Sequence, residues 1–317
     1  MTNRVNLRID FAFKQLFGTK GNEDILMSFL NAVLQKSLVS PITSLSLDDP
    51  HLHKEYKEDK LSIVDVRATL STGEQVNVEI QLSDKHDMKK RSLYYWAKLY
   101  TSQMNEGMPY RELHKAITIN VLDFILYPTH DSFQTTGTLW DMEKQLQVSH
   151  DIEIHFIELP KLVAQWRDAQ VNPWHDSLVR WLLLLSANED QNLTDTLEAI
   201  GMEQDETLQK AIQNWDNMSH NKEFRRTYEA REKLLLDEKA AVAHAEQKGR
   251  EQGLEEGLEQ GLEQGLEQGL EQGLEQGREE ERAQMIRKMS SRGATPEEIA
   301  DLTGFEIAEI HRILRLS

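Results

Sequence analysis

The chain has 317 residues, which is enough for one sizeable domain or two smaller ones. It contains no cysteine, which excludes disulfide bonds, zinc–thiolate sites and thiol nucleophiles and fits a reducing compartment. The formal net charge is −18, but residues 251–282 hold eleven glutamates and two arginines and so contribute half of it. The charge therefore neither supports nor excludes a nucleic-acid partner, because local basic clusters remain, as at residues 89–91.

The sequence gives no sign of a membrane segment or a leader. Its longest apolar run, at residues 181–187, is far too short to cross a bilayer. The first residues, MTNRVNLRIDFAFK, lack the apolar segment of a signal peptide. We expect a soluble, cytoplasmic protein with no membrane partner.

Residues 1–160 mix helical and strand patterns. Apolar spacing and turn signals predict helices at residues 11–17, 22–34 and 88–106, and strands at residues 63–70, 76–82, 116–122 and 152–159. This order of helices and strands predicts a mixed α/β domain.

Residues 161–245 have helical patterns throughout. Their four tryptophans are expected to anchor a core by packing rather than to bind a ligand: Trp166, Trp174, Trp181 and Trp215. We therefore expect a helical extension of the α/β domain.

Residues 246–282 form a repeat in which glycine recurs every fourth position from Gly249 to Gly277, mostly separated by Leu-Glu-Gln. Eight glycines cost a helix roughly 8 kcal/mol relative to alanine, and glutamates four residues apart repel each other. Leucine, glutamate and glutamine nevertheless favour helices. The repeat is either a helix that forms an oligomer seam or a flexible tether, and it carries no chemistry in either case.

Residues 283–317 form a small helical tail. In TPEEIADLTG, Thr295 is placed as a helix N-cap, with Pro296 at the first helical position and Glu298 completing a capping box. A second helix follows the glycine, which gives the outline of a helix-turn-helix. Its last helix offers His311, Arg312 and Arg315 to a DNA backbone, but the tail equally suits a protein-interaction cap.

The segment VDVRATLSTGEQVNVEIQL, from residue 64, predicts a β-hairpin with one carboxylate on each strand. Because side chains alternate across a strand, Asp65 and Glu79 can meet on one face, on the side opposite the valines. Such a polar face can simply meet solvent, as in many antiparallel sheets. Two close carboxylates also suit a magnesium ion, which can activate water and stabilise charge on a phosphate under attack.

Five blocks in this order resemble the Rpn family of recombination-promoting nucleases, also described as putative transposases, in the PD-(D/E)xK nuclease superfamily. The blocks are DFAFKQLFG, ILMSFLNAVLQ, DKLSIVDVRATLSTGEQVNVEIQL, KKRSLYYWAKLYTSQMNEGMPYRELHKAITINVLDF and IHFIELPK. The resemblance covers roughly residues 7–161 and continues more loosely through FRRTYEAREKLLLD, the repeat and the tail. It implies a restriction-endonuclease-like α/β core, followed by an all-helical C-terminal region.

The resemblance also assigns site residues. Asp65 matches the metal-binding aspartate of the superfamily, Glu79 matches the acid of the (D/E)xK motif, and Asp10 fits a further metal ligand. The resemblance suggests three contacts to substrate: Arg91, Tyr95 and Gln103.

Gln81 stands where most of the superfamily has lysine, and the Rpn family is similar in having glutamine there. Neutral glutamine can orient water but adds no positive charge. A second metal ion, or a nearby base such as Lys14 or Lys60, is expected to supply that charge, and Lys60 is preferred because it precedes Asp65 on the strand approach.

We therefore expect a Mg²⁺-dependent DNA endonuclease that promotes recombination or acts on mobile or foreign DNA, as in defence. Its core is expected to be a mixed sheet of four or five strands flanked by helices. No nucleotide-binding loop is present, so no nucleotide cofactor is expected. Cleavage of both strands needs two sites, which favours a homodimer. The alternatives are a non-catalytic DNA-binding or regulatory protein with the nuclease fold, and an oligomeric interaction protein built on the repeat.

Overall fold

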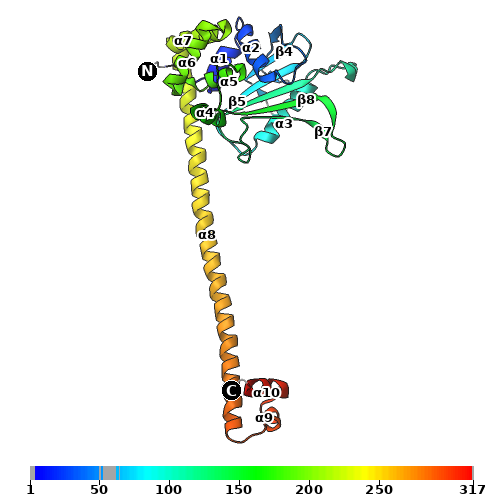
Figure 1. The fold of residues 1–317 in the computed structure, drawn as a ribbon, viewed down its shortest axis with the longest axis vertical. Coiled ribbons are helices and arrows are strands. Elements are labelled where there is room, and N and C mark those ends of the chain that lie inside the picture. The colour runs from blue at the N-terminus through cyan, green and yellow to red at the C-terminus, as the bar shows by residue number, and fades with distance from the viewer. Residues whose placement is uncertain (1–3, 50, 53–61, 64, 316–317) are drawn as a thin grey trace. The chain divides into compact units, whose positions relative to one another are not determined.

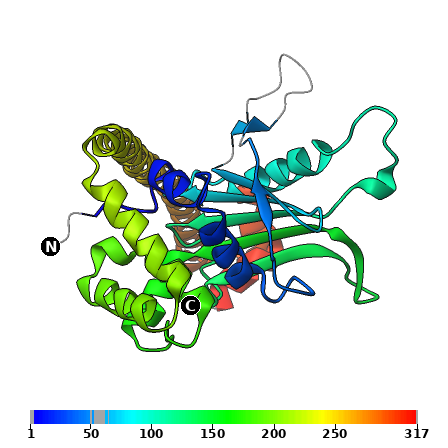
Figure 2. The ribbon, with the colours of Figure 1, turned by 90° about the horizontal axis from the view of Figure 1, so that it is seen from above.

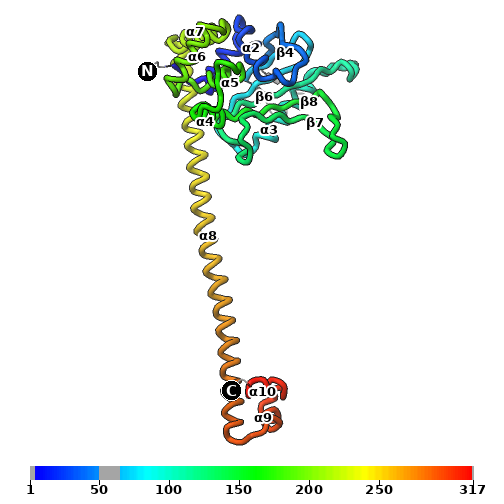
Figure 3. Tube along the Cα trace, in the orientation of Figure 1, coloured from blue at the N-terminus to red at the C-terminus, as the bar shows by residue number. Residues whose placement is uncertain are grey.

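The computed structural model describes residues 4–49, 51–52, 62–63 and 65–315. The chain divides into two compact units, Met1–Lys239 and Ala240–Ser317, and each is described by itself. The order of the elements along the chain can be followed by colour in Figure 3.

The first unit is built on a six-stranded mixed sheet with the strand order β1-β4-β5-β6-β8-β7. Its strands are β1 (Leu45–Leu47), β4 (Val66–Leu70), β5 (Gln75–Gln81), β6 (Ala116–Leu122), β7 (Gln134–Asp141) and β8 (Leu146–Glu158). The central pairs β5–β6 and β6–β8 are parallel, and the three outer pairs are antiparallel. A separate two-stranded ladder joins β2 (His51–Leu52) and β3 (Ser62–Ile63).

The β4–β5 hairpin forms because its apolar residues alternate and its turn contains a glycine in the required conformation. In β4, Val66, Ala68 and Leu70 are buried on one face. Gly73 has φ +97°, and an added Cβ would lie 2.4 Å from ring atoms of His114, so no other residue fits this turn without strain. The register pairs Val66 with Val78. Because the strands are antiparallel, Asp65, which precedes Val66, lies beside Glu79, which follows Val78.

Helices cover both faces of the sheet. On one face, α1 (Asp10–Phe17) and α2 (Glu23–Leu34) contribute buried phenylalanines and leucines to the main core. On the other face, α3 (Met88–Thr101) packs against β6 and β8 through two smaller apolar clusters. The helices α2 and α3 accordingly lie on opposite sides of the sheet (Figure 1).

A group of helices extends the main core beyond the sheet and lies beside α2, in green in Figure 2. Its members are α4 (Leu159–Arg167), α5 (Ser177–Leu184), α6 (Gln191–Glu203) and α7 (Glu206–His220). A 3₁₀ turn at Ala187–Glu189 connects α5 to α6, and another at Tyr110–Glu112 lies between α3 and β6. Three of these helices begin at an aspartate whose side chain caps the backbone: Asp176, Asp190 and Asp205. Trp181 and Trp215 are fully buried, while Trp166 and Trp174 pack against the core from its edge.

The helix α8 (Lys222–Ser291) begins in the first unit and contains the glycine repeat in the second. The six leucines of the repeat, Leu254 to Leu274, are 57–74 % exposed. The second unit also holds α9 (Pro296–Thr303) and α10 (Ile307–Arg315), and its small core is Ile286, Ile299 and Ile310. Thr295 and Glu298 form the predicted capping box, and Gly304 ends α9 in the left-handed conformation.

The predicted fold class, a restriction-endonuclease-like α/β core with an all-helical C-terminal region, is confirmed, with three corrections. The sheet has six strands rather than four or five, because β1 and β7 were not predicted. The helix predicted at residues 88–106 ends at Thr101. The strand predicted at residues 63–70 is not continuous, because β3 pairs with β2 and Asp65 lies in a bend before β4. Across the described part of the chain, no helix is both long enough and apolar enough for a membrane crossing.

Candidate active site

A polar cavity of about 330 Å³ opens at the C-terminal end of β5, between the sheet and the starts of α1, α3 and α8. Fourteen residues line it, and nine of them carry charge: Arg8, Asp10, Lys14, Asp65, Glu79, Lys85, Arg91, Arg231 and Glu238. The cavity therefore gathers acids and bases from segments that are more than 200 residues apart in the sequence.

The two hairpin carboxylates converge at this cavity, as the sequence predicts. The backbone N–H of Ile80 donates to Asp65 Oδ2 at 2.7 Å, which fixes the bend residue against β5. The side chains of Asp65 and Glu79 are only 10 % and 3 % exposed. The polar face of the hairpin is thus covered by protein rather than open to solvent.

Among the described residues, Lys14 forms an ion pair with Asp65. It lies one helical turn after Asp10 on α1, so both side chains point from the same face of the helix. Its Nζ atom lies 3.2 Å from Asp65 Oδ1. Lys60, the base preferred from the sequence, lies outside the described residues.

Arg91 on α3 joins the two ends of the Glu-x-Gln motif. Its guanidinium donates from Nη2 to Glu79 Oε2 at 3.2 Å and from Nη1 to Gln81 Oε1 at 3.0 Å. The same group lies 5.2 Å from the ring centroid of Tyr95, in cation–π geometry. Arg91 therefore holds Glu79 by a hydrogen bond and also fixes the orientation of the Gln81 amide.

The electrostatics of the carboxylate pair favour an additional positive charge. Burial, followed by repulsion from Asp65, raises the pKa of Glu79 to about 8, although Arg91 and Lys14 oppose the shift. Burial also raises the pKa of Asp65. In the described part of the chain, Glu79 Oε1 has no hydrogen-bond partner despite being buried. Two desolvated carboxylates with a free buried oxygen are a donor set that fits a hard divalent cation such as Mg²⁺.

Asp10 lines the same cavity but is bound to another residue. Arg231, on α8, donates to both carboxylate oxygens of Asp10, at 3.0 and 2.8 Å. Burial opposes ionisation of Asp10, but these hydrogen bonds and the charge of Arg231 outweigh it and lower the pKa of Asp10. Within the ranges that the structure describes, no three His, Asp or Glu side chains are grouped so that they could hold a metal ion.

The geometry agrees with a comparison against protein families. A family model described as PD-(D/E)XK nuclease family transposase matches residues 7–245. The chain belongs to this family. No curated protein and no solved structure matches the chain significantly. The predicted relation to putative transposases of the PD-(D/E)xK superfamily is confirmed, and the match extends through the first turns of α8.

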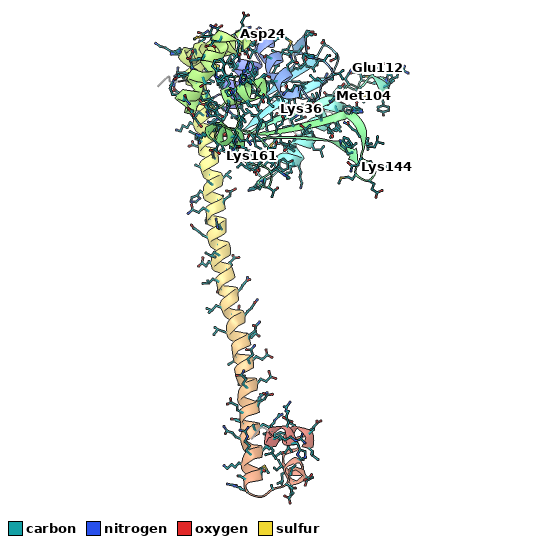
Figure 4. The ribbon with its side chains drawn as sticks, in the orientation of Figure 1. Asp24, Lys36, Met104, Glu112, Lys144 and Lys161 are labelled. Carbon is teal, nitrogen blue, oxygen red and sulfur yellow. The ribbon has the colours of Figure 1, made fainter. Side chains whose placement is uncertain are left out.

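The other two predicted substrate contacts, Tyr95 and Gln103, differ in their position relative to the cavity. Tyr95 is buried behind Arg91 and packs with Leu99 and Ala116. Gln103 lies beyond the end of α3, where its amide donates to the backbone carbonyl of His114 and accepts from its N–H. This residue precedes Met104, in the connection between α3 and β6 that Figure 4 marks with Met104 and Glu112. The structure therefore places Arg91 in the wall of the cavity. Tyr95 is connected to the cavity only by its contact with Arg91, and Gln103 does not line the cavity.

Sequence reasoning missed the contribution of α8. Arg231, Leu235 and Glu238 line the cavity, and Glu238 forms an ion pair with Lys85. The only sequence signal was the looser resemblance of FRRTYEAREKLLLD, because an arginine in a charged helix normally predicts a solvent-exposed face.

A buried polar row under α3 was missed as well. Asn77, Thr118 and Asn120 are fully buried on β5 and β6, and the register places Asn77 beside Thr118 and Glu79 beside Asn120. Asn120 donates to Ser92 of α3 and to the backbone of His155, at 2.7 and 2.9 Å. Burying polar side chains costs free energy, and this row extends the polar character of the site along the sheet.

Proposed function

We propose that this member of the nuclease family is a divalent-metal-dependent DNA endonuclease, with Mg²⁺ as the expected ion. The observation that carries the proposal is the convergence of Asp65 and Glu79 at one cavity, with the buried Glu79 Oε1 lacking a partner among the described residues. Family membership supports a nuclease-related activity and DNA as substrate.

Each residue has a distinct proposed role in phosphodiester hydrolysis. Asp65 and Glu79 hold the ion, with Asp10 as a candidate third ligand. When bound, the ion supplies positive charge to the phosphate and acidifies a water molecule. Water then attacks phosphorus in line with the leaving oxygen and gives up a proton to solvent. The P–O bond to the 3′ oxygen breaks, and this oxygen takes up a proton from solvent. The products expected by analogy with the superfamily carry 5′-phosphate and 3′-hydroxyl ends.

The charge that the missing motif lysine would supply is assigned to Lys14, with Arg91 in support. Lys14 is 3.2 Å from Asp65 and lines the cavity, so its ammonium group can stabilise negative charge on a phosphate bound there. Arg91 holds Glu79 and Gln81 in fixed positions, which leaves it less free to contact substrate directly. Lys60 stays a prediction.

Nicking of a supercoiled plasmid tests the proposal. The wild-type protein is expected to nick with Mg²⁺ and to lose activity in EDTA. Asp65→Asn and Glu79→Gln, which keep side-chain size, are expected to lower the rate at least about 100-fold. The matched control is Asp24→Asn, because Asp24 is an exposed acid of α2 that pairs with Lys210 and does not line the cavity. Activity that persists in EDTA, or in both site variants, would move the chemistry elsewhere.

The biological task is proposed at a coarser level, as recombination or action on mobile or foreign DNA in the cytoplasm. Cutting both strands requires two copies of the site, so a homodimer is the proposed assembly. Light scattering checks this, and a single symmetric peak at the monomer mass of 36.7 kDa would contradict it.

One observation favours a non-catalytic DNA-binding protein as the second candidate. Lys14 and Arg91 already occupy oxygens of both hairpin carboxylates. If these contacts persist in the DNA complex, Glu79 Oε1 is the one oxygen of the pair without a partner among the described residues, which is too few ligands to hold an ion. Such a protein would bind DNA without nicking it, and its DNA affinity would not respond to Mg²⁺.

A further inference from the structure

The pairing of Arg231 with Asp10 brings α8 into the site. The two hydrogen bonds, at 3.0 and 2.8 Å, run from Nε and Nη2 to separate carboxylate oxygens, which is the fork geometry of a bidentate pair. Both residues line the cavity that contains Asp65 and Glu79. Asp10 is therefore close to the hairpin acids but already engaged.

Arg231 differs from the other cavity arginines in its accessibility. Its side chain is 44 % exposed, whereas Arg8 is almost fully buried and held by Asp123 and Glu189. Arg91 is held on two sides, by Glu79 and Gln81. Arg231 is thus the guanidinium of this cavity that a phosphate can reach with the smallest rearrangement.

We propose that Arg231 exchanges Asp10 for a phosphodiester of bound DNA, and that the released Asp10 joins Asp65 and Glu79 as a metal ligand. The inference rests on the proposed function and names the group that couples DNA binding to metal binding. A guanidinium fork fits a phosphate as well as it fits a carboxylate, so the exchange replaces one bidentate contact with another.

The exchange explains why, in the free protein, Asp10 is paired with Arg231 instead of lying with Asp65 and Glu79 as a metal ligand. Without Arg231, Asp10 would add a third negative charge beside Asp65 and Glu79 in a desolvated setting, where carboxylates repel one another strongly. Pairing Asp10 with Arg231 removes one of them from that set until both an ion and a phosphate arrive. By thermodynamic linkage, DNA must then raise metal affinity by the same factor by which metal raises DNA affinity.

The helix α8 does not need to leave the site for the exchange to occur, because other contacts hold its first turns. Phe224 stacks on Phe11 of the N-terminal segment, with ring centroids 4.9 Å apart. Tyr228 accepts a hydrogen bond from the backbone N–H of Asn6 at 2.9 Å. These contacts keep the position of Arg231 while its side chain changes partner.

Calorimetric titration of the full chain with Ca²⁺, alone and with a short DNA duplex, tests the exchange. Ca²⁺ is the probe because it takes the same oxygen ligands as Mg²⁺, and a gel verifies that the duplex stays intact. In the wild type, DNA is expected to tighten Ca²⁺ binding about 10- to 100-fold. Arg231→Gln is expected to bind Ca²⁺ more tightly without DNA, to lose this enhancement, and to bind DNA more weakly.

Two further variants keep the test decisive. Asp10→Asn is expected to bind DNA more tightly without metal, since Arg231 is freed, and also to lose the enhancement. Lys210→Gln is the matched control, because Lys210 makes a comparable two-oxygen pair with Asp24 at 2.7 and 2.8 Å and does not line the cavity. It should leave both affinities and their coupling as in the wild type.

The outcomes separate the exchange from the function on which it rests. If Arg231→Gln and Asp10→Asn both keep the wild-type enhancement while Asp65→Asn abolishes Ca²⁺ binding, the exchange is refuted and the metal site stands. If Asp65→Asn and Glu79→Gln both bind Ca²⁺ as the wild type does, the proposed function itself fails.

Discussion

The substitution Glu79→Gln is expected to stabilise the metal-free protein at alkaline pH while abolishing its activity. The pKa of Glu79 is about 8 in the folded protein, against 4.5 for an ordinary glutamate. The folded state therefore holds a proton that the unfolded state has lost between pH 4.5 and pH 8, so stability falls as pH rises through this window. At 1.36 kcal/mol for each pH unit, the full loss is on the order of 5 kcal/mol.

Urea unfolding in EDTA, at pH 6 and pH 9, measures the part of this loss that falls above pH 6. All six tryptophans lie before residue 240, so tryptophan fluorescence reports the unfolding of the first unit alone. The difference in stability between Glu79→Gln and wild type is expected to change by about 3 kcal/mol in favour of the variant from pH 6 to pH 9, because two of the pH units below the folded pKa lie in this range. Groups other than Glu79 contribute equally to both proteins, so their effect cancels in the comparison.

Two controls bound the interpretation. Glu153→Gln alters another buried glutamate of the sheet, which His155 and Lys115 hold by hydrogen bonds, and this variant should be destabilised at both pH values. Mg²⁺ should restore stability to the wild type at pH 9 but not to Glu79→Gln, because only the wild type keeps the ligand. A stability difference that does not change between pH 6 and pH 9 would refute the argument that Glu79 is buried without adequate compensation.

Three further predictions follow from the site and the sheet. Lys14→Gln should lower the nicking rate about 100-fold at saturating Mg²⁺, and an unchanged rate would return the role to another base. Arg91→Lys should lower the rate as well, since an ammonium group cannot span Glu79 and Gln81, although DNA affinity should change little. Burial favours the protonated form of Glu153, but hydrogen bonds from His155 and Lys115 outweigh it and lower the pKa of Glu153 to about 2. Glu153 should therefore contribute stability above pH 4.5 that is lost as the pH falls from 4.5 to 2. Acid unfolding of wild type and Glu153→Gln measures this loss.

The sequence predicted the parts of the fold whose information is local. The hairpin could be predicted because β4 and β5 alternate and Gly73 marks the turn, and this register alone brings Asp65 beside Glu79. The capping box of α9 could be predicted because Thr295 and Glu298 are three residues apart. In each case the residues that decide the structure lie within one turn or one hairpin.

The missed features depend on distant contacts or on atypical patterns. The strand β7 was missed because its sequence, QTTGTLWD, carries three threonines and a glycine rather than an apolar face, and none of its residues is fully buried. The hairpin that it forms with β8 continues to the exposed turn that Figure 4 marks with Lys144. Arg231 was missed because its partner, Asp10, is 221 positions away in the sequence. The burial of the hairpin's polar face under α3 was also missed. Alternating polar and apolar residues predict that the two faces of a strand differ, but they do not show whether a helix covers the polar face.

The contact between Arg91 and Gln81 also bears on how the (D/E)xK motif can vary. An ammonium group at position 81 would face the guanidinium of Arg91, whose Nη1 lies 3.0 Å from Gln81 Oε1. Two cations at that separation would repel each other, so reverting glutamine to the lysine common in the superfamily would damage this site rather than repair it. Arginine on α3 and a neutral residue at the end of β5 are therefore compatible in this site, and we expect lysine at position 81 to be tolerated better when Arg91 is also replaced by a neutral residue.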